Sequence, residues 1–69
     1  MEESWVVLEI QTAEDGKVST IATPFADQME AESEYHRVLT YAAVSTLPRH
    51  AASLLSTEGT LVESRCYAH

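Results

Sequence analysis

The chain has 69 residues, of which 45% are apolar, and its 11 acidic and 4 basic side chains give a net charge of −7. This length fits one domain, which we expect to span residues 1–69, and the apolar share argues against disorder. The charge repels nucleic-acid phosphates and anionic lipid, so direct binding to nucleic acid or a membrane is not expected. No apolar run approaches the ~20 residues of a membrane helix.

The N-terminal residues MEESW have neither the basic region nor the apolar core of a signal peptide, which predicts a soluble, cytoplasmic protein. Cys66 is the only cysteine, so the chain has no disulfide and no paired spacing for structural zinc. A chain this short buries only about 60% of its unfolded surface. Association with a second copy is therefore the expected extra source of stability.

Residues 4–25 predict a β-hairpin, because β-branched and aromatic side chains dominate both of its arms, 4–12 and 18–25. Asp15–Gly16 suits a two-residue turn of type I′. Centring the turn on this pair sets three pairs of residues on one face: Ile10 with Ile21, Leu8 with Thr23, and Val6 with Phe25. The opposite face of the first strand then carries Trp5 and Val7.

Residues 27–46 predict an amphipathic helix. Its apolar stripe surrounds Tyr35 at helical spacing and consists of Ala31, Val38, Leu39 and Ala42, with Gln28 and Thr46 at the rim. Asp27 is expected to cap the first turn, and Pro48 to stop the helix. The outer side of the helix also carries apolar residues, namely Met29, Tyr41 and Val44.

Residues 50–67 predict a second hairpin around Glu58–Gly59, with two registers open. A two-residue turn pairs Leu55 with Val62 and Ala51 with Cys66, whereas a three-residue loop with Gly59 at a bulge pairs Leu54 with Val62. The pattern does not decide which of Leu54 and Leu55 points inward. The two hairpins echo each other, because IQTAEDGKVST and LLSTEGTLVES share the same order of strand, acid, glycine and strand.

The predicted fold is therefore α+β, in the order β-β-α-β-β, with a four-stranded antiparallel sheet and one central helix packed on one face. The uncovered face of the sheet is expected to carry Trp5 and Val7. A candidate interface thus consists of the residues Trp5, Val7, Met29, Tyr41 and Val44. Apolar residues left on outer surfaces favour a homodimer.

No residue pattern predicts an enzyme, a catalytic residue or a bound cofactor. Glu32 and His36 lie four residues apart on the helix, but an acid–base pair needs a pocket and a nucleophile that the sequence does not indicate. Both glycines are used by turns, which leaves none for a phosphate-binding loop. His50, Cys66 and His69 form a loose candidate for metal or ligand binding; the alternative is a small thiol with unrelated histidines.

The segment from Asp27 onward resembles a family of small uncharacterised proteins encoded in phages and prophages of Gram-positive gut bacteria. The matching residues are Glu30, Ala31, Tyr35, His36, Leu39, Ala42 to Ser45, Pro48, His50 to Ala52, Ser64, Tyr67 and His69. The resemblance implies a setting among phage structural and assembly genes, in a bacterial host cell, and it implies no mechanism.

Three functional hypotheses follow. The first is a non-enzymatic, homodimeric interaction or assembly-accessory protein with a phage or host protein as partner. The second is an acidic inhibitor that mimics nucleic acid and acts on a host nuclease, which predicts two rows of carboxylates at phosphate spacing. The third is a small metal- or ligand-binding module that uses His50, Cys66 and His69.

Overall fold

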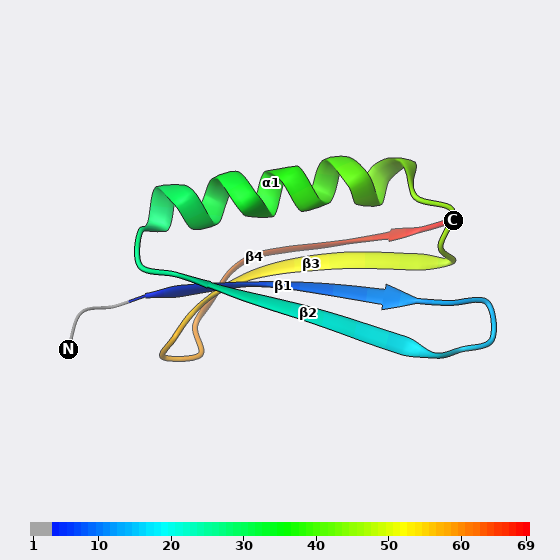
Figure 1. Ribbon diagram of the computed structural model, residues 1–69, viewed down its shortest axis with the longest axis horizontal. Coiled ribbons are helices and arrows are strands. Elements are labelled where there is room, and N and C mark those ends of the chain that lie inside the picture. Colours follow the sequence, from blue (N-terminus) through cyan, green and yellow to red (C-terminus); the bar gives the residue numbers. More distant parts are fainter. Residues whose placement is uncertain (1–3) are drawn as a thin grey trace.

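The computed structural model describes residues 4–69, which form four strands and one helix in the predicted order (Figure 1). The elements are β1 (Trp5–Thr12), β2 (Val18–Phe25), α1 (Gln28–Val44), β3 (Arg49–Ser56) and β4 (Leu61–Ala68). The α+β fold class is confirmed. Residues 1–3, which we included in the single predicted domain, lie outside the described residues.

The strands form one antiparallel sheet in the order β2-β1-β3-β4. β1 and β3 are the central strands, and β2 and β4 are the edges. The helix links the edge strand β2 to the central strand β3 and runs along one face of the sheet (Figure 1). The result is a two-layer molecule that is elongated along its strands, with extents of 41 × 20 × 15 Å.

α1 confirms the predicted helix and its inner stripe. Asp27 is the N-cap, because its carboxylate accepts a hydrogen bond of 3.0 Å from the backbone N–H of Met29. The helix ends at Val44, two residues before the predicted end, since Ser45 turns to extended backbone with a ψ of 150°. The buried residues of the helix are Ala31, Tyr35, Val38 and Ala42, and Leu39 packs beside them.

The first hairpin closes with a three-residue loop, where the sequence predicted a two-residue turn. The N–H of Ala13 donates to the carbonyl of Lys17 and the N–H of Gly16 donates to the carbonyl of Ala13, each over 2.9 Å. Gly16 has a φ of +87°, which fits the left-handed position that follows a type I turn. The register therefore shifts by one residue, so Trp5 pairs with Phe25 and the predicted partner of Val6 was wrong.

This shift corrects the faces of the sheet, because neighbouring residues of a strand point to opposite sides. Val7 lies beneath the helix with only 2% of its surface exposed, and Trp5 and Phe25 pack against the same core. Trp5 and Val7 were therefore wrongly placed on the uncovered face. Apolar side chains on both faces of β1 made the two registers look alike in the sequence.

The second hairpin repeats the three-residue loop and combines both predicted registers. The N–H of Ser56 donates to the carbonyl of Thr60 over 2.9 Å, and Gly59 has a φ of +93°. Ala51 pairs with Cys66, as the two-residue turn predicted, but a bulge between Leu54 and Leu55 shifts the register nearer the loop. Leu54 points towards the helix and is fully buried. The loose echo between the hairpins thus corresponds to two loops of the same design.

Candidate interaction surface

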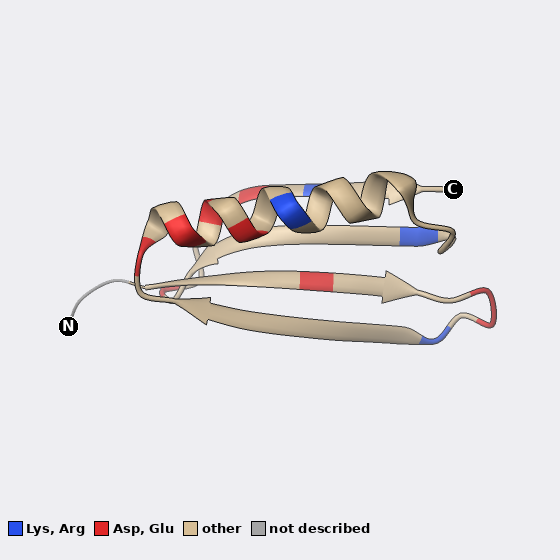
Figure 2. Cartoon of the chain, turned by 45° about the horizontal axis from the view of Figure 1, so that its top comes forward, with Lys and Arg blue, Asp and Glu red and all other residues tan. Residues whose placement is uncertain are grey.

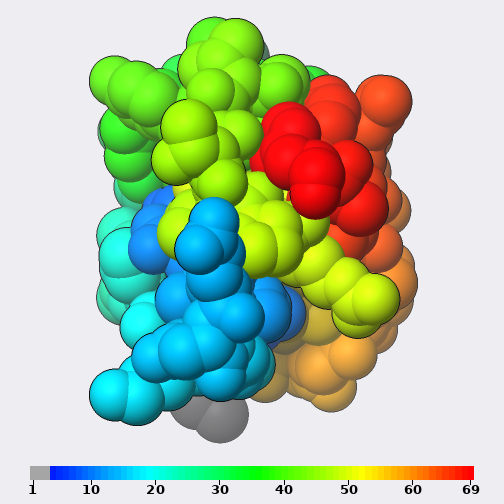
Figure 3. Space-filling model, turned by 90° about the vertical axis from the view of Figure 1, so that its right-hand side faces the viewer, coloured from blue at the N-terminus to red at the C-terminus, as the bar shows by residue number. Residues whose placement is uncertain are grey.

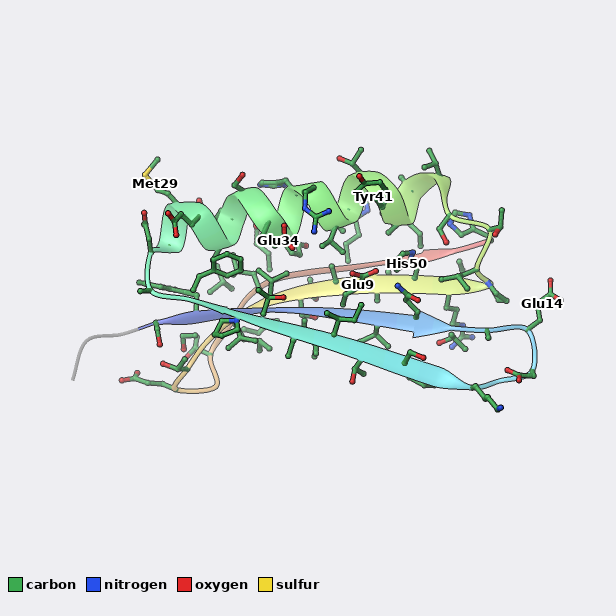
Figure 4. All side chains as sticks on the ribbon, viewed as in Figure 1. Glu9, Glu14, Met29, Glu34, Tyr41 and His50 are labelled. Atoms are coloured by element: carbon green, nitrogen blue, oxygen red, sulfur yellow. The ribbon has the colours of Figure 1, made fainter. Side chains whose placement is uncertain are left out.

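The face of the sheet that the helix does not cover is apolar across all four strands. Alternation along the strands from buried Val7, Ala52 and Leu54 identifies its members. We call this surface the open face and define its apolar residues as Val6, Leu8, Ile10, Val18, Ala22, Pro24, Ala51, Leu55, Leu61, Val62, Cys66 and Ala68. Figure 4 shows side chains that project from the sheet on the side away from α1.

The open face carries no acidic residue on any of its four strands, although the chain has a net charge of −7. The single charged residue that its strands place there is Arg49, at the start of β3. Thr12, Thr20, Ser53 and Ser64 are the polar members. At the centre of the face, Val6, Leu8 and Ile10 of β1 are half-buried by their neighbours alone. The centre of the open face thus joins the apolar row of β1 to Ser53 of β3, and its strands place no carboxylate there.

The acids of the described residues lie elsewhere (Figure 2). One group lies on the first half of α1 and includes Glu30, Glu32 and Glu34, and further acids lie in the two hairpin loops. Two strand acids, Glu9 and Glu63, share the helix side of the sheet. This scattered distribution does not form the two rows of carboxylates that mimicry of nucleic acid predicts.

The outer side of α1 carries the other candidate interface residues, which do not form one patch. Met29 is 77% exposed at the start of the helix, and Tyr41 is exposed towards its other end (Figure 4). Val44, the last residue of the helix, is exposed as well. The guanidinium of Arg37 lies 5.5 Å from the centre of the Tyr41 ring. A charged neighbour therefore covers part of Tyr41, and the open face is the larger apolar surface.

Glu9 of β1 and His50 of β3 form a pair beneath the helix (Figure 4). The Nε2 of His50 lies 2.6 Å from Oε2 of Glu9, and Nε2 of Gln11 donates to the same oxygen over 2.7 Å. An ionised carboxylate only accepts, so Nε2 of His50 carries the donated proton. Nδ1 of His50 is buried without a hydrogen-bond partner among residues 4–69.

This environment lowers the pKa of Glu9. Burial alone would raise the pKa, but the hydrogen bonds from Gln11 and His50, together with the charges of His50 and Arg37, outweigh it. A catalytic acid or base must lie within about 3 Å of the proton it transfers. His50 is 5% exposed and its free nitrogen is buried, and the pair joins β1 to β3.

Sequence reasoning missed the Glu9–His50 pair, whose members are 41 residues apart. The available signal was a lone carboxylate in the middle of an apolar strand and a histidine that begins another such strand. The Glu32–His36 pair of the sequence analysis lies on the helix, where His36 is exposed and the centre of its ring lies 5.5 Å from that of Tyr35.

His50, Cys66 and His69 are not brought together. Cys66 pairs with Ala51 on the open face, whereas His50 lies on the helix side of the sheet. The ring of His69 makes a hydrogen bond of 2.9 Å with the carbonyl of Ala42. Figure 3 shows the C-terminal residues, in red, against the segment that follows the helix. Within residues 4–69 no cluster of three or more His, Cys, Asp or Glu side chains is arranged to hold a metal.

A scan against protein-family models and searches of curated proteins and of solved structures find no match to this chain. Across residues 4–69, α1 is too short and too polar to span a membrane.

Proposed function

We propose that this chain is a small, non-enzymatic interaction protein that acts as a homodimer, of the phage or prophage type that its sequence resembles. Its role is that of an assembly accessory or adaptor in a bacterial host cell, with a phage or host protein as the further partner. The observation that supports this proposal is the open face, an apolar sheet surface without a carboxylate on a strongly acidic chain.

An exposed apolar surface of this extent is typical of a binding site. A domain of this size also gains stability when a second chain covers such a surface. The acids on the helix and loops favour solubility and leave the open face as the surface most suited to contact with protein.

The test is the absolute mass of the chain in solution, measured by light scattering behind a sizing column over a range of concentrations. We expect a mass of twice the chain, which falls towards the monomer on dilution. A monomer at every concentration from about 1 μM to about 1 mM, a span that covers dimers of ordinary strength, contradicts the proposal.

A further inference from the structure

We infer that the open face is covered by the open face of a second copy, so that two sheets pack against each other with the helices on the outside. This inference rests on the proposed homodimer and identifies its surface. The arrangement has four layers in the order helix, sheet, sheet, helix. All four strands contribute side chains to this contact, and the outer backbone edges of β2 and β4 stay unpaired in it.

The charge distribution selects a second copy as the occupant. Two chains of net charge −7 repel each other over most of their surfaces. The open face has no acid on its strands, so it is the surface on which two such chains approach without opposed carboxylates. A basic partner would instead be drawn to the acidic first half of α1 (Figure 2).

The area is also sufficient. Four strands of eight residues form a face of about 27 × 19 Å at the usual rise and strand spacing, or about 500 Å² in projection. Two such faces bury about 1,000 Å² in projection, which reaches the lower bound of about 1,000 Å² for a biological interface. Two sheets that pack face to face keep their strand directions within about 30° of each other, an angle that arises from the twist of each sheet.

Leu8 distinguishes packing of the open faces from the other ways to dimerise. It lies in the middle of β1, between Ala22 of β2 and Ser53 of β3, so it is not on the outer backbone edge of either β2 or β4. A charge at Leu8 therefore blocks contact between the faces and leaves β2 and β4 free to pair with another chain. Tyr41 is the matched position on the outer side of α1, since it is an exposed apolar residue that the inferred contact does not include.

The experiment compares the dimer dissociation constants of the wild type, Leu8→Glu, Ser53→Glu and Tyr41→Glu by sedimentation or light scattering. Ser53 pairs with Leu8 on the open face, and its replacement removes no apolar side chain, so this variant tests the same surface with less risk to folding. Circular dichroism checks that each variant keeps its helix and sheet. We expect the dissociation constant to be at least 100-fold larger for Leu8→Glu and Ser53→Glu than for the wild type. For Tyr41→Glu the dissociation constant should change less than 3-fold.

The outcomes separate this inference from the proposed function. If the Leu8→Glu and Ser53→Glu variants fold and still dimerise like the wild type, the inference is overturned, but the proposed homodimer stands. If Tyr41→Glu weakens the dimer as strongly as the open-face variants do, the contact lies on the helix, and the inference is also overturned. A wild type that stays monomeric contradicts the proposed function itself. If that monomer sediments with phosphatidylcholine vesicles, the open face belongs to a lipid surface, which contradicts both.

Discussion

The two faces of the sheet are built from the same four strands, yet they differ in chemistry. The helix side holds Trp5 and Phe25 and the hydrogen-bonded pair of Glu9 and His50. The open face holds small and aliphatic side chains and no acid. A covered face accepts a charged group because a partner is built in beside it. A face that is apolar without a cover of its own is suited to contact with another molecule.

Leu54 and Leu55 give the largest contrast, because these neighbours point to opposite faces. Leu54→Ala leaves a cavity under α1 and should lower the free energy of unfolding by about 2–5 kcal/mol. Leu55→Ala should lower it by about 1 kcal/mol or less when the chain is dilute and monomeric, because Leu55 is only half-buried. Urea denaturation at low concentration measures both. Equal losses would mean that the two faces are equally covered within one chain.

The Glu9–His50 pair gives the next largest effect. Glu9→Gln keeps the shape of the side chain but removes the charge that His50 faces, and should lower the free energy of unfolding by about 1–2 kcal/mol. Glu63→Gln is a matched control on the same side of the sheet, because Glu63 is exposed. Its expected change is less than about 0.5 kcal/mol. Similar losses in the two variants would show that the pair adds nothing to the helix side.

The same pair predicts a dependence on acid. The folded state lowers the pKa of Glu9 below its ordinary value of 4.5, so its contribution is fully present above pH 4.5. The contribution is lost as the pH falls through the lower pKa of the folded chain. The difference in unfolding free energy between wild type and Glu9→Gln should therefore shrink on acidification. A difference that grows below pH 4.5 would contradict the lowered pKa. The hydrogen bond from Arg37 also lowers the pKa of Glu34. Because Glu34 is present in both the wild type and Glu9→Gln, its contribution cancels in the difference between their unfolding free energies.

The outer side of the helix should give the smallest effect. Met29→Ser alters a side chain that is 77% exposed and should change the free energy of unfolding by less than about 0.5 kcal/mol. It should also leave the mass in solution unchanged, because Met29 is remote from the open face. If the variant became monomeric, the interface would lie on the outer side of the helix and not on the open face.

The helix and its inner residues could be predicted from the sequence because apolar residues that recur every 3.6 residues all fall on one side of a helix. The faces of β1 could not. Asp15–Gly16 fits either a two-residue turn or a three-residue loop, and the two differ by one residue in register. Val6 and Val7 are both apolar, so either register buries an apolar residue under the helix, and the sequence does not exclude one of them. The contact between Glu9 and His50 depends on the pairing of β1 with β3, which no local pattern determines.

The pairing of β1 with β3 also implies an order of folding events, in which the two hairpins form before the central pair of strands. Each hairpin closes through a three-residue loop, so it can form within microseconds from residues close in sequence. The central ladder, which brings Glu9 to His50 across 41 residues, must wait for the chain between them to close. Until it does, β1 and β3 each present a bare inner edge. Another chain's β3 or β1 fits that edge equally well, so refolding at high concentration favours exchange of whole hairpins between chains.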